Sequence, residues 1–213
     1  MQVKKGQSIE DASMQMIEDE VGDHQYSNME WQIVRRIIHS TADFDYINNN
    51  KIIFHKDAIR NGICAIKNHH SIIVDVNGVI GGLNKQNPID FENDIVCNIS
   101  RSDVAELARK EGKTRSQAAM RMAVKDMQDG IVAIGNAPTA LQEVIQMIKE
   151  GIARPALVVG IPVGFICAAE SKEELRSLDS TPFITNIGRK GGSPSASAII
   201  NALYKLVRAE SFP

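Results

Sequence analysis

A chain of 213 residues, 43% of them hydrophobic, is long enough to bury one sizeable core, and residues 1–213 are expected to form a single domain. The formal net charge of -2 counts against a nucleic-acid or anionic-membrane partner, because either needs a clustered basic face. No apolar run reaches the roughly 18–20 residues that span a bilayer, and the first residues lack the apolar core of a signal peptide, so a cytoplasmic protein is expected.

The N-terminal segment predicts a helix from Ser8 to about Glu20, because Ser8 and Asp11 have the spacing of a capping box. Apolar residues at helical spacing form its predicted inner face: Ile9, Ala12, Met16 and Ile17. Ser13 lies on the same side and is expected to point towards the core or a pocket. It either hydrogen-bonds to its own backbone or contacts a ligand, and the pattern alone favours neither.

A second helix is predicted from Ser27 to His39, and the residues from Thr41 onward break it. The carbonyls of the last turn favour a protonated His39 by about 0.3–1 kcal/mol, and Arg36 on the same face opposes this by a similar amount. A histidine, whose ordinary pKa is about 6.5, suits proton transfer. A lone histidine after an apolar stripe is nevertheless more often a partly buried structural residue. Trp31 and Met16 are candidate anchors of a subunit interface.

From Lys51 onward, short runs rich in Ile and Val alternate with helical segments, which is typical of a sheet buried on both faces. The predicted strands are residues 52–54, 71–76, 94–99, 131–134, 156–160 and 183–187. The predicted helices are residues 57–67, 102–110, 115–128, 139–150, 172–178 and 193–207. We therefore predict an α/β fold, a three-layer sandwich with a mainly parallel sheet, preceded by the two N-terminal helices.

The spacing of cysteine and histidine predicts no metal site, and no cofactor is expected. The three cysteines are far apart, lack CxxC spacing and lie among apolar residues, which favours buried, reduced thiols: Cys64, Cys97 and Cys167. His69 and His70 have no carboxylate or thiol nearby at a ligand spacing.

Several turns at strand ends and helix starts are candidates for binding anions. Asp75 ends a strand, where it could act on a ligand or cap the following turn. Asn136 lies between a strand and a helix whose free N–H groups favour anions, although any strand–turn–helix unit has such a turn. Arg115 follows a predicted N-cap, where it could bind a carboxylate or be a solvated surface residue. Arg189 and Lys190 form a cationic turn before the last helix, and Lys190 is expected to substitute partly for Arg189.

Four segments, in this order, resemble the precorrin-8 methylmutase family of cobalamin (corrin) biosynthesis: IGNAPTAL, PALVVGIPVGF, AAESKEEL and GRKGGS. The resemblance extends from about Ser13 to Ala209. It implies an isomerase that moves a methyl group from C-11 to C-12 of precorrin-8X or cobalt-precorrin-8, giving hydrogenobyrinate or cobyrinate without an outside methyl donor. It also implies a homodimer with the site near the subunit interface.

The same resemblance implies roles for individual residues. RRIIHS matches the family segment whose histidine is the catalytic acid, so His39 is expected to be the general acid. Arg115 stands in the TRS context of the family's substrate-binding arginine. The residues expected to bind the substrate, the corrinoid precursor, are Ser13, Arg36, Arg115, Asn136 and Arg189.

Two other classes of function stay open. A non-catalytic tetrapyrrole carrier could use the same anion-binding turns, but it would have no need of an acid such as His39. A phosphate- or nucleotide-binding enzyme is the third reading, although the chain lacks a Walker loop, a dinucleotide turn, HExxH and a Ser-His-Asp order.

Overall fold

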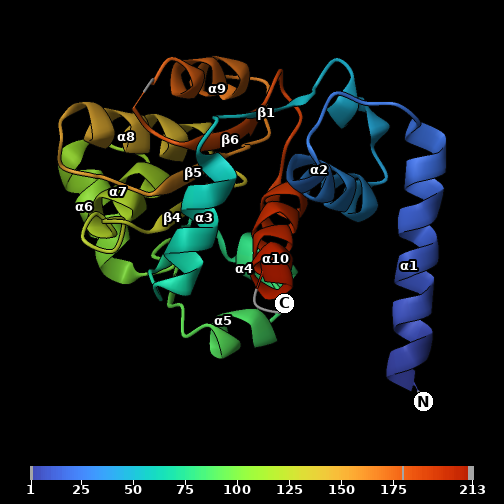
Figure 1. Cartoon of the computed structure of the whole chain (residues 1–213). Coiled ribbons are helices and arrows are strands. Elements are labelled where there is room, and N and C mark those ends of the chain that lie inside the picture. Colours follow the sequence, from blue (N-terminus) through green and yellow to red (C-terminus); the bar gives the residue numbers. More distant parts are fainter. Residues whose placement is uncertain (1, 179, 211–213) are drawn as a thin grey trace.

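Two helices begin the chain, α1 (Gln2–Val21) and α2 (Asn28–Thr41), in a computed structural model that describes residues 2–178 and 180–210. Figure 1 shows α1 standing apart from the rest of the molecule, with α2 on the side of the body that faces it. The predicted start of α2 is confirmed. Ser27 Oγ accepts a hydrogen bond from the N–H of Glu30, and the Glu30 carboxylate accepts one from the N–H of Ser27.

The buried side of α1 agrees with the predicted one at Ile17 and differs from it at Ile9 and Met16. Met14 and Ile17 are 8% exposed, whereas Ile9 and Met16 are 60% and 70% exposed. The prediction placed this face of α1 on the core, but α1 lies apart from the sheet and packs against α2 (Figure 1). Glu18 accepts hydrogen bonds there from the side chains of α2.

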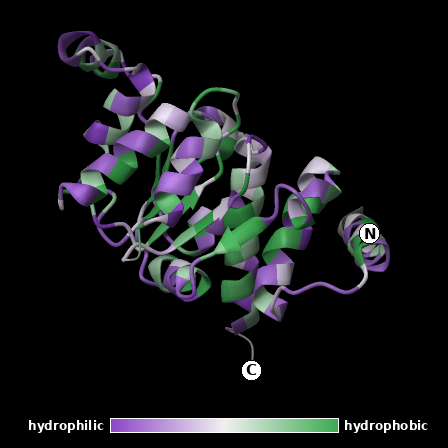
Figure 2. Cartoon of the chain, turned by 90° about the horizontal axis from the view of Figure 1, so that it is seen from above, coloured by the Kyte–Doolittle hydropathy of each residue, from purple (hydrophilic) through white to green (hydrophobic). Residues whose placement is uncertain are grey.

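A six-stranded sheet forms the centre of the fold, in the order β1-β6-β5-β4-β2-β3. The strands are β1 (Ile52–Phe54), β2 (Ile72–Val74), β3 (Ile95–Val96), β4 (Ile131–Ile134), β5 (Leu157–Gly160) and β6 (Phe183–Asn186). Among the strands of the described residues, the β1–β6 pair is antiparallel and the other four pairs are parallel, so the predicted mainly parallel sheet is confirmed. In Figure 2 the hydrophobic colour marks strands in the middle of the molecule, and hydrophilic stretches mark much of the surrounding helices.

Helices cover both faces of this sheet, which confirms the three-layer α/β sandwich. One face packs against α2 and against α3 (Ala58–Lys67), α4 (Asn77–Gly82) and α10 (Ser193–Glu210). The other face packs against α6 (Ser102–Glu111), α7 (Arg115–Met122), α8 (Pro138–Lys149) and α9 (Ala168–Arg176). The alternation is visible within β4, where Ile131 and Ala133 belong to the first core and Val132 and Ile134 to the second.

Three short helical segments were not predicted: η1 (Phe44–Ile47), α4 and α5 (Gln86–Asp90). Each is too short to show the apolar period of a longer helix. The helix predicted to reach Gln128 ends at Met122 instead, and turns lead from there into β4. The described part of the chain has no helix that is both long and apolar enough to cross a membrane.

The order of the strands creates a switch point between β2 and β4. From β2 the chain proceeds to β3 on one side, and from β4 it proceeds through β5 to β6 on the other. The loops that leave β2 and β4 therefore diverge, and in open α/β sheets ligands bind in the crevice that this divergence leaves at the carboxyl ends of the strands. Asp75 follows β2 and Gly135 follows β4 at this point.

The cysteines are free, as predicted, but their expected burial is wrong. Cys64 is exposed on the outer side of α3, and Cys97 and Cys167 are only partly buried. Among the residues that the structure describes, no three His, Cys, Asp or Glu side chains gather in a group that could hold a metal ion.

Candidate active site

Arg115 begins α7 at the carboxyl edge of the sheet. Thr114 caps this helix as predicted, with its Oγ1 accepting from the N–H of the third helical residue. Thr114 Oγ1 and Ser116 Oγ lie 3.2 Å and 2.9 Å from Thr139 Oγ1, in the first turn of α8. Arg115, which is exposed, therefore stands beside the turn that carries Asn136.

Arg189 lies in the turn that follows β6. The N–H of Gly164 donates to the Arg189 carbonyl at 3.2 Å, and the N–H of Gly192 donates to the Ile161 carbonyl at 3.0 Å, so the turns after β5 and β6 lie against each other. The Arg189 guanidinium is 5.9 Å from the centre of the Phe165 ring. Since Phe165 is 85% exposed, an apolar ring and a cation stand together at this edge.

Asp75 occupies the switch point. Its carboxylate accepts hydrogen bonds from the N–H groups of Gly135, Asn136 and Ala137, at 2.9, 2.8 and 2.7 Å. The side chain is fully buried, and this burial raises the pKa of the Asp75 carboxyl, while the three N–H donors oppose the rise. Asp75 thus caps the turn after β4, whereas the sequence predicted that it caps the turn following its own strand or acts on a ligand.

This arrangement changes what the turn after β4 can offer a ligand. The backbone donors expected to receive an anion from outside are already bonded to the chain's own carboxylate. The predicted role of Asn136 therefore rests on its side-chain amide, which is exposed at the edge. A nucleotide phosphate held by the N–H groups of this turn would have to displace Asp75, which counts against the phosphate-binding reading.

His39 lies in the last turn of α2, as predicted, and is partly exposed. The hydroxyl of the next residue, Ser40, donates to the Pro194 carbonyl at 3.4 Å, which places this end of α2 at the start of α10. The start of α10 in turn packs on the turn after β4, because a Cβ at Gly135 would lie 2.9 Å from the Ser193 Cα. The His39 ring makes no hydrogen bond within the described residues.

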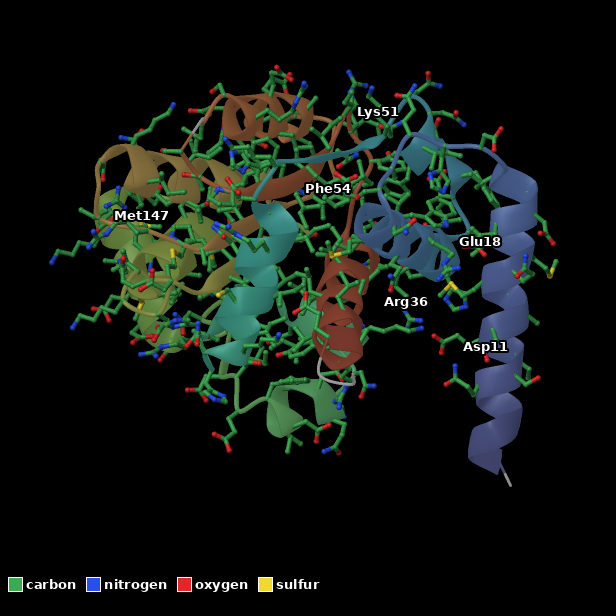
Figure 3. The ribbon with its side chains drawn as sticks, viewed as in Figure 1. Asp11, Glu18, Arg36, Lys51, Phe54 and Met147 are labelled. Carbon is green, nitrogen blue, oxygen red and sulfur yellow. The ribbon has the colours of Figure 1, made fainter. Side chains whose placement is uncertain are left out.

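Arg36 and Ser13 lie away from the carboxyl edge of the sheet. Arg36 is on the side of α2 that faces α1, and Ser13 is in α1 itself. Arg36 Nη1 donates to the Glu10 carboxylate at 2.6 Å, and both residues line a cavity of about 310 Å³ between α1, α2 and α10. Figure 3 labels Arg36 on the side of α2 that faces α1. The cationic residues of this cavity are Arg35, Arg36, Lys205 and Arg208. Ser13 Oγ donates to the Ile9 carbonyl at 2.8 Å, so its hydroxyl is bonded to its own helix.

The chain therefore gathers Arg115, Asn136 and Arg189 at the carboxyl edge, with His39 near the start of α10. The family model described as Precorrin-8X methylmutase matches residues 8–206. The chain belongs to the precorrin-8X methylmutase family. Methylmutases are isomerases, so the chain is an enzyme that catalyses an intramolecular methyl transfer.

Individual relatives agree with this assignment. The methylmutase is 49% identical over 197 residues to the cobalt-precorrin-8 methylmutase of Priestia megaterium, covering 92% of this chain and 86% of that protein. It is 43% identical over 208 residues to the cobalt-precorrin-8 methylmutase of Leptospira interrogans, covering 94% of each. The crystal structure of the Thermus thermophilus precorrin-8x methyl mutase has a TM-score of 0.88 at 37% identity, covering 97% of this chain and 98% of that chain.

Lys190 of the methylmutase is not free to assist Arg189. Its Nζ lies 2.8 Å from the Asp43 carboxylate and 3.2 Å from that of Asp45. The hydrogen bond from Lys190 lowers the pKa of Asp45, and the Asp43 carboxylate raises the pKa of Lys190. This pairing counts against the expectation that Lys190 substitutes for Arg189, because the two carboxylates after α2 bind its ammonium group.

Lys172 was missed among the residues that shape the site. It is 1% exposed, and its Nζ donates to the carbonyls of Gly188 and Lys190 at 3.0 and 2.5 Å. Burial lowers the pKa of Lys172 to about 7. The buried residues of α9 follow the i, i+3, i+4, i+7 pattern: Ala168, Ser171, Lys172 and Leu175. This period in AAESKEEL was a signal that Lys172 faces inward, although its acidic neighbours are typical of a solvated surface.

Proposed function

We propose that this methylmutase moves a methyl group from C-11 to C-12 of precorrin-8X or cobalt-precorrin-8, with His39 as the general acid. The similarity over nearly the whole chain to proteins named cobalt-precorrin-8 methylmutase carries the proposal. In this shift the C–C bond at C-11 breaks, a C–C bond at C-12 forms, and no atom is added from outside. The protein needs no nucleophile for it. It has to hold the macrocycle and supply one proton donor to a ring nitrogen.

The carboxyl edge has the chemistry that such a substrate requires. Arg115 and Arg189 are exposed, and guanidinium groups bind the carboxylates of acetate and propionate side chains in a bidentate manner. Phe165 and Ile166, 85% and 81% exposed, give an apolar surface beside Arg189 for the face of a flat ring system. The Asn136 amide adds a donor and an acceptor between them.

Conversion of the two candidate substrates tests the proposed reaction. Purified enzyme is mixed, in separate anaerobic reactions, with precorrin-8X and with cobalt-precorrin-8, and the products are followed by absorption and mass. An isomerisation changes the spectrum and leaves the mass unchanged. The proposal fails if neither substrate is converted, and the faster of the two identifies the preferred form.

Arg115→Ala is expected to raise KM by about 10- to 100-fold, because each charged hydrogen bond to a carboxylate contributes roughly 1.5–3 kcal/mol. The conversion rate at saturation should change little, since an arginine on a peripheral carboxylate binds ground and transition states alike. Arg189→Ala should have a comparable effect, because Lys190 is held by Asp43. Arg109→Ala, which removes an exposed arginine bonded to its own helix, is the control for steady-state kinetics. A lower rate at saturation with unchanged KM would show that Arg115 takes part in the chemistry.

A homodimer in dilute solution is the second expected property. The helix α1 stands apart from the body and exposes Ile9 and Met16, which would lose water contact on pairing with a second copy. Trp31, the other candidate anchor, is buried against Glu18 within the chain and is not available to a subunit interface. Sedimentation at micromolar concentrations should give twice the chain mass of 23.4 kDa. A species with the mass of one chain would contradict the dimer.

A further inference from the structure

Lys172 lies beneath the turn that presents Arg189. Its Nζ donates to the carbonyls of Gly188 and Lys190, the residues on either side of Arg189. The side chain comes from α9 and is 1% exposed, whereas Arg189 is exposed on the outside of the turn. Within the described residues no carboxylate pairs with the Lys172 amine, so its contacts are with backbone oxygens.

A buried lysine without a counter-ion is unfavourable compared with an apolar residue of the same size. The lowered pKa of Lys172, about 7, has the same origin, since burial disfavours the charged form. The neutral amine still carries two N–H donors and the ammonium carries three, so both carbonyls have a donor in either state. Lys172 therefore supplies N–H donors to two carbonyls, which an apolar side chain could not do.

Other contacts also hold this turn, among them the Gly164 N–H on the Arg189 carbonyl and the Lys190 ammonium on Asp43. Asn186 Nδ2 donates to the Lys190 carbonyl at 3.0 Å, from beside Lys172. Gly191 has φ +159°, and a Cβ there would lie 2.3 Å from the Ile161 carbonyl oxygen, so the backbone runs close against the turn after β5. The inward carbonyls thus meet side-chain donors, and the Arg189 side chain is directed outward to the edge.

We propose that Lys172 is a positioning residue, whose amine holds the Gly188 and Lys190 carbonyls and so fixes the Arg189 guanidinium where the substrate carboxylate binds. The part of this inference that concerns substrate rests on the proposed function. The part that concerns the turn does not, and hydrogen exchange tests it separately.

Lys172→Met removes the donors and keeps most of the side-chain volume. The amide of Gly192, which is bonded to Ile161, should exchange faster with solvent in this variant, and the amides of β4 should not. Lys149→Met is the matched control, because Lys149 forms an exposed ion pair with Glu174 of α9. Unchanged exchange of the turn would overturn the proposal. If Lys172→Met does not fold, Lys172→Gln replaces it, since the amide keeps an N–H donor at shorter reach, and faster exchange of the turn is again expected.

Substrate binding then separates positioning from a general loss of stability. In the folded Lys172→Met variant the Kd for the corrinoid should rise by about tenfold, because Arg189 is no longer pre-organised. The rate in bound substrate should stay within about threefold. The double variant with Arg189→Ala should bind no more weakly than Arg189→Ala alone, since both changes remove the same contact. Additive losses would overturn the proposal. If the turn exchanges faster but the parent enzyme binds no corrinoid, the anchoring role stands and the proposed function fails.

Discussion

Replacing His39 with alanine is expected to slow conversion of bound substrate by about 10²- to 10⁴-fold, the usual contribution of general acid catalysis. Binding of the corrinoid should stay nearly unchanged, because other residues of the edge are the ones proposed to hold the substrate. The fold should tolerate the change, since the His39 ring is partly exposed and has no hydrogen bond within the described residues. Single-turnover absorption with enzyme in excess measures the chemical step directly.

His39→Asn distinguishes proton transfer from positioning. Asparagine keeps a hydrogen-bond donor of similar size but cannot hand over a proton, so it should lose activity as alanine does. Activity retained with Asn and lost with Ala would make His39 a positioning donor. His24→Ala, at an exposed histidine before α2, controls for the loss of an imidazole. If both His39 variants convert bound substrate within about threefold of the parent, His39 is not the acid.

Local signals in the sequence predicted much of the fold correctly. The capping residues Ser27 and Thr114 start α2 and α7 where expected, because a cap depends only on residues three positions away. The alternation of Ile-rich and Val-rich runs with helices predicted the mainly parallel sheet, and it too is visible in neighbouring stretches of the chain. The position of His39 in the last turn of α2 also followed from local breakers.

Contacts between distant residues were beyond the reach of the sequence. Asp75 meets N–H groups about sixty residues further on, at Gly135 to Ala137, and nothing in SIIVD specifies those partners. Lys190 pairs with Asp43, 147 positions away, and the sequence does not specify that contact either. The buried side of α1 depends on where that helix stands relative to the body. The period of its apolar residues does not specify that placement.

Asp75→Asn is expected to lower the free energy of unfolding by about 3 kcal/mol, because a buried charged acceptor is lost and one donor is left unsatisfied. In the parent, one carboxylate oxygen accepts from Gly135 and the other from Asn136 and Ala137. An amide has a single oxygen, and its NH₂ group would face at least one of these N–H groups. Urea denaturation at fixed protein concentration measures the change. Asp103→Asn, at an exposed surface ion pair, should leave the urea midpoint almost unchanged, because solvent screens such a pair.

Asp75→Ala tests whether the N–H groups after β4 bind an external anion once their own carboxylate is removed. It leaves the N–H groups of Gly135, Asn136 and Ala137 without their carboxylate, and formate has the same charged group in a smaller molecule. Formate should therefore raise the urea midpoint of the alanine variant and leave that of the parent unchanged, since a ligand stabilises only the form that binds it. Equal stabilisation of both would show that these donors are open to external anions in the parent. The turn after β4 would then be a binding site in its own right, and Asp75 would not be the group that fills it.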